Sequence, residues 1–125
     1  MPKANVDQTF VALRDVLKAY AKKMRVEVDK PGEYQLCEAD RTDRVGRPLF
    51  VASVAKRKSY VSFYLMPVYA CPDLVKTLSP SLKKRMQGKS CFNFTDIEPA
   101  HVEELSVLTR VGIERFKRVK LPWAE

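Results

Sequence analysis

The chain has 125 residues and a net charge of +8, from 23 Lys and Arg against 15 Asp and Glu. This length fits one domain whose single core needs no disulfide or metal to hold it together. The apolar runs are too short for a membrane-spanning helix, and the start MPKANVDQTF lacks the apolar region of a secretory signal. We therefore predict one cytoplasmic domain over residues 1–125, with no membrane partner.

Three cysteines, Cys37, Cys71 and Cys91, are an odd number and lie too far apart for a CxxC ligand pair. This usage is typical of reduced thiols in a reducing compartment, so we expect no structural disulfide. The positive charge favours an anionic partner such as nucleic acid, phosphate or a small acid. Its scatter along the chain is also typical of a solvated surface.

The N-terminal third predicts a helix followed by two strands. From Asp7 to about Met24, apolar residues recur every three or four positions, which is helical periodicity. The Asp-Lys-Pro-Gly sequence at 29–32 carries turn chemistry between two alternating runs. We therefore predict short strands over Arg25–Val28 and Glu33–Glu38. The charged and aperiodic segment Ala39–Arg47 should be an exposed loop.

The central stretch from Arg47 to Tyr69 holds two apolar runs separated by the basic tract 56–58. Its β-branched and aromatic residues predict a β-hairpin. In the second arm Val61, Phe63 and Leu65 share one parity and should face the core. The residues of the other parity should form a wetter face: Tyr60, Ser62, Tyr64 and Met66.

Turn and capping residues mark the next elements. Pro67 should end or bend the second arm, because it cannot donate to a strand ladder. One or two helical turns should follow over Asp73–Leu78. Ser79-Pro80 then fits the start of a second short helix, SLKKRM, and Gly88 stands where a C′ residue should stop it.

A strand and a long helix are predicted for the C-terminal third. The run Ser90–Phe94 should be the strand. Thr95 and Glu98 fit a capping box, so the helix should begin near Asp96 to Pro99 and run to about Lys117. Its buried stripe should consist of the apolar residues Val102, Leu105, Leu108, Ile113 and Phe116.

Two further features complete the predicted fold. Gly112 should permit the close approach of a neighbouring element, and the apolar tail Leu121-Pro122-Trp123 should dock on the body. Together the elements predict an α+β fold. It is an antiparallel sheet of about five strands with an N-terminal helix, short middle helices and a long C-terminal helix packed on it.

Three segments also carry a likeness to a known family. They are Gly46–Phe50, the strand Tyr60–Leu65 with Lys56 and Lys58 before it, and Leu78–Phe94, which ends in GKSCFNF. With the long final helix they resemble the YdhG-like family, small bacterial α+β domains of unknown function. The likeness covers about the last two-thirds of the chain and implies an antiparallel sheet covered by helices.

Some members of that family are described as frataxin-like iron chaperones, which implies iron binding as an alternative function. Surface iron sites need clustered carboxylates, often with His. The first helix offers only Asp7 and Asp15, about two turns apart. An acidic concentration lies at the start of the last helix, where the helix dipole alone favours carboxylates: Asp96, Glu98, Glu103 and Glu104 with the lone His101. We assign no metal ligand and no cofactor.

The basic residues of the second half suggest an anion pocket. Lys83, Lys84 and Lys89 bracket a predicted helix end near the sheet. The candidate lining on the polar face of the hairpin is Lys56, Lys58, Tyr60, Tyr64, Lys83, Lys84 and Lys89. The triplet GKS at 88–90 lacks the earlier glycine of a phosphate-binding loop and precedes a strand, which excludes nucleotide hydrolysis.

Two other hypotheses concern Cys71 and the hairpin aromatics. Cys71 stands before Pro72 at a possible helix start, where the dipole favours a thiolate, although the single histidine, His101, lies on another element. Four aromatic and basic residues of the hairpin have the chemistry to stack single-stranded bases: Tyr60, Tyr64, Lys56 and Lys58. No RRM, KH or helix-turn-helix signature is present.

These patterns assign no catalytic residue. We predict a non-enzymatic module that binds a small anionic ligand or a protein partner through the polar face of the hairpin. An iron chaperone and a basic nucleic-acid-binding module are the alternatives. The sequence does not predict an oligomeric state.

Overall fold

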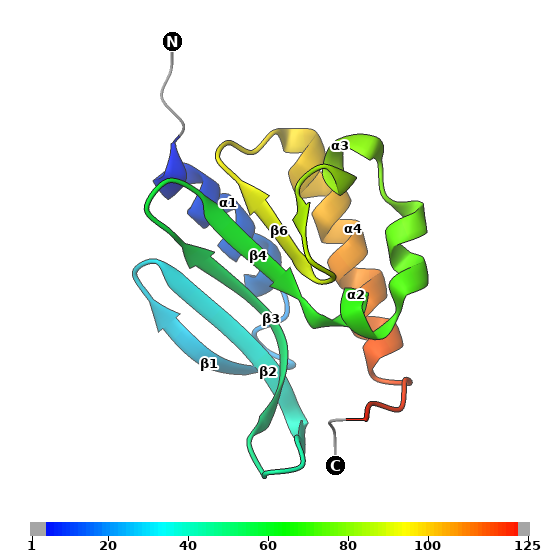
Figure 1. Ribbon diagram of the computed structural model, residues 1–125. Helices are drawn as coiled ribbons and strands as arrows, with labels where there is room; N and C mark the ends of the chain where they lie inside the picture. The colour runs from blue at the N-terminus through cyan, green and yellow to red at the C-terminus, as the bar shows by residue number, and fades with distance from the viewer. Residues whose placement is uncertain (1–4, 123–125) are drawn as a thin grey trace.

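The computed structural model describes residues 5–122, which form one antiparallel sheet with helices packed on it (Figure 1). The strand order is β1-β2-β3-β4-β6-β5. The strands are β1 (Arg25–Lys30), β2 (Glu33–Thr42), β3 (Pro48–Lys56), β4 (Val61–Leu65), β5 (Met86–Gln87) and β6 (Cys91–Phe94). The helices are α1 (Val6–Lys18), α2 (Met66–Ala70), the 3₁₀ helix η1 (Pro72–Thr77), α3 (Pro80–Lys83) and α4 (Pro99–Phe116).

This architecture confirms the predicted α+β class with an N-terminal helix, short middle helices and a long C-terminal helix. The helix α2 was not predicted, because Met66 was assigned to the wetter face of the second hairpin arm, whereas β4 ends at Leu65 and Met66 begins the helix. The sheet has six strands, one more than predicted, because the short strand β5 was not foreseen. Within residues 5–122, no helix combines the length and the apolar content that crossing a membrane requires.

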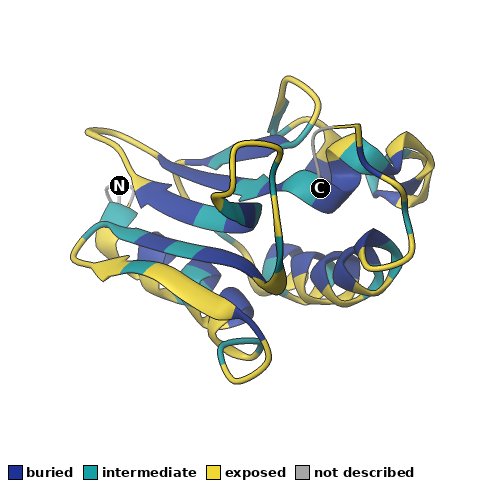
Figure 2. Ribbon diagram, turned by 90° about the horizontal axis from the view of Figure 1, so that it is seen from below, coloured by how far each residue is buried: buried dark blue, intermediate teal, exposed yellow. Residues whose placement is uncertain are grey.

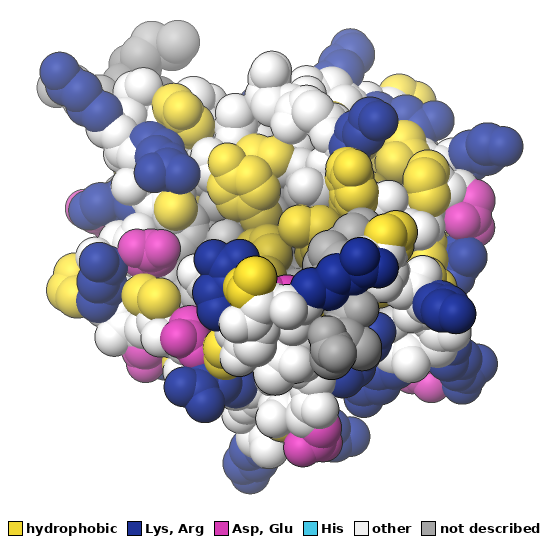
Figure 3. Space-filling view, turned by 60° about the horizontal axis from the view of Figure 1, so that its bottom comes forward, with side chains coloured by type: hydrophobic (Ala, Val, Ile, Leu, Met, Phe, Trp, Pro, Cys, Tyr) yellow, Lys and Arg dark blue, Asp and Glu magenta, His cyan; other side chains and the backbone are white. Residues whose placement is uncertain are grey.

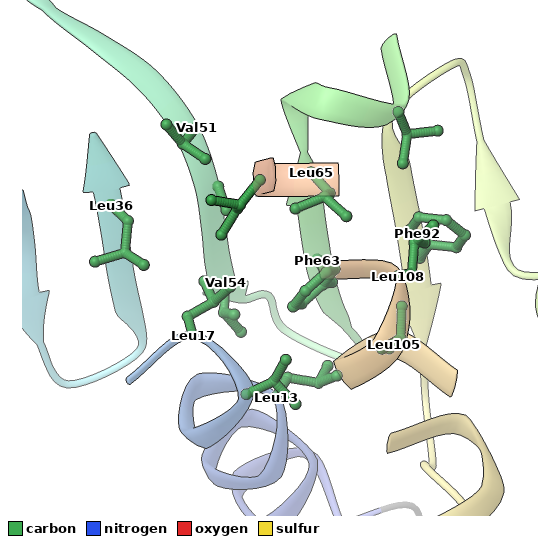
Figure 4. Packing of buried hydrophobic residues seen from close by; sticks show 14 of the residues in the cluster. Leu13, Leu17, Leu36, Val51, Val54, Phe63, Leu65, Phe92, Leu105 and Leu108 are labelled. Atoms are coloured by element: carbon green, nitrogen blue, oxygen red, sulfur yellow. The ribbon is translucent and has the colours of Figure 1, made fainter. Parts of the chain in front are cut away.

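The helices α1 and α4 lie side by side on one face of the sheet and enclose the core with it. Figure 4 shows Leu13 of α1 and Leu105 of α4 directed toward strand residues such as Phe63. Val61, Phe63 and Leu65 are fully buried, as their shared parity predicts. Complete burial of a large apolar side chain stabilises the fold by about 1.5–3 kcal/mol, so these three residues help to hold both helices on the sheet.

The first helix and the second strand end at other residues than predicted. The helix α1 ends at Lys18, and tight turns carry the chain from there to β1 through bonds such as Tyr20 N to Leu17 O at 3.0 Å. The prediction to Met24 was wrong because these turns keep a spacing close to that of a helix. The strand β2 runs on to Thr42, which pairs with Pro48, so residues 39–42 are not the predicted loop.

Arg41 explains why the charged end of β2 is ordered. Its Nη1 donates a hydrogen bond to the Phe116 carbonyl oxygen at 3.0 Å, and the guanidinium lies 5.8 Å from the centre of the Phe116 ring. A cation at the carboxyl end of a helix satisfies a carbonyl without an intrahelical partner and complements the helix dipole. Arg41 therefore ties the β2–β3 hairpin to the end of α4.

The predicted short helix SLKKRM is only partly helical. Ser79 caps α3 as predicted, because its Oγ accepts from Leu82 N at 3.1 Å. The helix ends at Lys83, however, and Met86 pairs with Phe92 as part of β5. Cross-strand pairing at the sheet edge overrides the helix propensity of Lys, Arg and Met. Gly88, at φ 80°, serves the β5–β6 turn and not a helix end.

The long helix α4 has the predicted end but not the predicted cap. It begins at Pro99 with Glu98 in the N-cap position and no side-chain cap bond, so the capping box of Thr95 and Glu98 does not form. The helix ends at Phe116, one residue from the prediction. Leu121 is buried, which confirms the docking of the tail up to that residue, and Trp123 lies outside the described residues.

Gly112 lets α4 approach α2 closely, as predicted. A Cβ atom at this position would lie 3.0 Å from Cβ of Pro67, which is itself buried at the start of α2. Real Cβ contacts are rarely this short, and the proline ring has little freedom to move aside.

We predict that Gly112→Ala destabilises the protein by about 1–3 kcal/mol, because overpacking outweighs the gain in helix propensity of about 1 kcal/mol. Urea unfolding would measure the change. The matched control compares Ser106→Gly with Ser106→Ala at an exposed position of the same helix, where alanine should be the more stable. If the change from glycine to alanine raised the free energy of unfolding equally at positions 112 and 106, Pro67 would have moved aside without an energetic cost, which would contradict the prediction.

Candidate ligand-binding face

The strand side chains that point away from α1 and α4 form what we call the open face. In Figure 1 this face is turned toward the viewer, while the helices lie behind or beside the sheet. Cross-strand pairing aligns its residues in two rows over β2, β3, β4 and β6. One row is Glu33, Ala55, Ser62 and Asn93, and the other is Gln35, Ser53, Tyr64 and Cys91.

A polar network joins the two rows at β4 and β6. Ser62 Oγ donates to Asn93 Oδ1 at 2.8 Å, and Cys91 Sγ donates to the same oxygen at 3.4 Å. Ser62 is only 2% exposed, so the face predicted to be wetter is partly sealed by its own side chains. A satisfied network of this kind holds the side chains of the open face in fixed positions.

Tyr64 stands at the centre of the open face. Its hydrogen bond with Cys91 raises the pKa of the phenol, the Cys91 charge and burial act in the same direction, and a side-chain hydrogen bond with Arg57 opposes them. Because its pKa lies above the ordinary value of 10.0, Tyr64 remains a neutral donor and acceptor near pH 7. Arg57 was not among the predicted site residues.

A hollow of about 410 Å³ opens between the β2–β3 turn and the start of α2. Its apolar lining is Pro48, Leu49, Phe50 and Met66, and its polar lining is Glu27, Gln35, Cys37, Asp43 and Arg47. Figure 3, which brings this end of the molecule forward, shows hydrophobic side chains gathered near the centre with Lys and Arg around them. Burial raises the pKa of the Cys37 thiol, so this sulfur stays protonated.

Asp43 fixes the turn at the rim of this hollow. Its Oδ1 accepts from the backbone N of Val45 and of Arg47 at 3.0 Å each, and its Oδ2 accepts from Arg47 Nε at 3.0 Å. Burial acts to raise the pKa of Asp43, but these hydrogen bonds and the Arg47 charge outweigh it and lower the pKa. Gly46, at φ 87°, supplies the left-handed residue that the turn needs.

The predicted site residues of the hairpin are separated by the sheet. Lys56 Nζ bonds Asp7 Oδ1 at 2.8 Å, which places its head on the α1 side and away from Tyr64. Lys58 and Tyr60 are exposed in the β3–β4 turn. Of the four hairpin residues, only Tyr64 lies within the rows of the open face.

The other predicted lysines do not gather around Tyr64 either. Lys83 and Lys84 are exposed at the end of α3, near the end of β6 that Asn93 occupies. Lys89 lies in the β5–β6 turn, with Nζ 5.9 Å from the centre of the Tyr69 ring. The structure therefore does not assemble the predicted lysines into one anion pocket.

The residues of the thiol-catalysis hypothesis and of the iron-binding hypothesis do not form a site either. Cys71 is buried, and the ring of His101 has Ser81 as its neighbour, with Nε2 2.8 Å from Ser81 Oγ. Glu104 accepts from the backbone N and from Oγ of Ser79 at 2.7 Å each. Within residues 5–122, no three His, Cys, Asp or Glu side chains converge as a metal site would require.

Another hollow, of about 530 Å³, lies between η1 and α4. Most of its lining is aliphatic, and two of its polar groups are already bonded, because Glu104 holds Ser79 and Thr77 Oγ1 donates to the Leu74 carbonyl. Small-molecule sites combine apolar walls with a few polar groups that orient the ligand. The hollow of the open face carries the guanidinium of Arg47 and the carboxamide of Gln35 beside its apolar wall, and we therefore take it as the candidate site.

Comparisons with protein-family models, with curated proteins and with solved structures found no match for this chain. Membership of the YdhG-like family therefore stays a prediction.

The raised pKa of Tyr64 predicts a pH dependence of stability. Because the native state favours the protonated phenol, this contribution is complete below pH 10.0 and is lost as the pH rises through the higher native pKa. From about pH 9 to about pH 11, the free energy of unfolding should fall less in Tyr64→Phe than in the wild type. Urea unfolding at each pH would measure it.

Tyr60→Phe is the matched control, since Tyr60 lies outside the rows of the open face. Its urea unfolding over the same pH range provides the reference for removal of a phenol from an exposed position. Identical slopes for Tyr64→Phe and the wild type would contradict the raised pKa of Tyr64.

Proposed function

We propose that this protein is a binding module that holds a small organic ligand in the hollow of the open face. The observation that carries the proposal is that Arg47, bonded to Asp43, lines the same hollow as the apolar wall that includes Phe50. Preorganised polar groups beside an apolar wall reduce the ordering cost of binding.

The size and lining of the hollow support this function. About 410 Å³ is within the range of small-molecule sites, which is about 300–1,000 Å³. Phe50 and Met66 are half-buried, so a ligand can remove their remaining surface from water. Gln35, in the row of Tyr64, adds a carboxamide at the edge of the hollow.

The protonation states support binding rather than covalent chemistry. Both Tyr64 and Cys37 have a raised pKa, so the phenol and the thiol stay neutral and act as hydrogen-bonding groups. We place the protein in the cytoplasm, which the free state of Cys37, Cys71 and Cys91 supports. The order of the elements supports a YdhG-like domain.

The iron-chaperone and nucleic-acid alternatives are not proposed. His101 is engaged with Ser81 and Glu104 with Ser79, so these two groups are not available together to a metal. Lys56, which would accompany Tyr64 in a base-stacking surface, is bound to Asp7 on the α1 side.

Titration of the ¹⁵N-labelled protein with a library of neutral, anionic and cationic aromatic fragments tests the proposal. Shifts should centre on Gln35, Arg47 and Phe50, because these residues line the hollow. Phe50→Ser removes the aromatic wall and should weaken binding by about tenfold or more, since burial of an aromatic side chain contributes on the order of 2 kcal/mol.

Tyr60→Ser is the control, because it removes an exposed aromatic ring outside the hollow, and it should leave the affinity unchanged. Shifts that are scattered evenly over the surface, or that centre on the hollow between η1 and α4, would defeat the proposed function.

A further inference from the structure

We propose that the ligand is a small aromatic carboxylate, with its ring against Phe50 and Met66 and its carboxylate on the guanidinium of Arg47. This inference rests on the proposed function and names the class of ligand. It follows from which hydrogen-bond donors of Arg47 and Gln35 already have a partner within the protein.

The Asp43 bond determines how Arg47 can meet a ligand. Asp43 Oδ2 accepts from Nε at 3.0 Å, and Asp43 Oδ1 accepts from the backbone N of the same residue. The guanidinium is thus held at its Nε side, and no group within residues 5–122 is bonded to its two Nη atoms, which leaves them for a ligand. A pair of parallel N–H groups fits the two oxygens of a carboxylate in bidentate geometry.

The charges at the rim favour a monoanion over a dianion. Two carboxylates line the hollow, and each is paired with one arginine: Asp43 with Arg47, and Glu27 with Arg25 at 2.6 Å. The charges of these two pairs already cancel, so a ligand with one negative charge meets less repulsion from Asp43 and Glu27 than a ligand with two. A phosphate with two charges would also face the carboxylates of Asp43 and Glu27, and like charges at short range repel.

The wall of the hollow favours a flat ring. Phe50 offers an aromatic surface, and Met66 offers a polarisable thioether, which makes favourable contacts with aromatic rings. Pro48 continues the same apolar wall. Gln35 Nε2 makes only a weak bond, at 3.8 Å to Cys37 Sγ, so its carboxamide can turn to a polar substituent on the ring.

Isothermal titration calorimetry with four probes tests the inference. They are naphthoate, the neutral naphthamide, cyclohexanecarboxylate and naphthyl phosphate. Naphthoate should bind about tenfold or more tightly than each of the other three, because only it combines the flat ring with a single negative charge.

Two variants in the same turn separate the role of Arg47 from general charge. Arg47→Gln should abolish the preference for naphthoate over naphthamide and retain the binding of naphthamide. Arg44→Gln removes the same charge from an exposed residue that does not line the hollow, and it should keep the preference of the wild type. A ¹⁵N spectrum of each variant checks that the fold is intact.

The outcomes distinguish the two proposals. Equal binding of naphthoate and naphthamide at the open face, tighter binding of naphthyl phosphate, or an unchanged preference in Arg47→Gln would overturn the carboxylate inference alone. Failure of all four probes and of the fragment library to shift the open face would overturn the proposed function as well.

Discussion

The structure depends on one constraint: both long helices, α1 and α4, cover the same face of the sheet. An antiparallel sheet tolerates this arrangement because alternate side chains can meet water. Every second side chain of β3 and β4 then points to the open face, where its polar groups need hydrogen-bond partners. Ser62, Asn93 and Cys91 do so among themselves, which satisfies polar groups that would otherwise be costly to bury.

The same constraint places the candidate site. The β2–β3 hairpin extends beyond the covered part of the sheet, and Arg41 fastens it to the end of α4 through the Phe116 carbonyl. Its turn is closed by Asp43, which also orients Arg47. Figure 2 shows that β1 at the sheet edge is largely exposed, so the hollow lies between an open edge and the helical part of the molecule.

The alternation in β4 and the role of Gly112 could be predicted, because each depends on one side chain and its local spacing. The position of Phe50 could not. Leu36 pairs with Ala52 but Cys37 pairs with Phe50, so a bulge at Val51 changes which residues of β3 meet the open face. Lys56 could have been placed correctly, since it has the parity of the buried Val54 and not that of Ser53. Arg41 acts through a partner 75 residues away, which no local pattern reveals.

The most direct measurement is the access of a neutral gadolinium chelate to methyl and ring protons of the two faces. The account predicts strong paramagnetic broadening for the methyl of Met66 and the ring of Tyr64, and weak broadening for Leu65 and Phe63, their neighbours along the chain. Equal protection of all four residues would contradict it, because it would mean that a further layer covers the open face and closes the hollow.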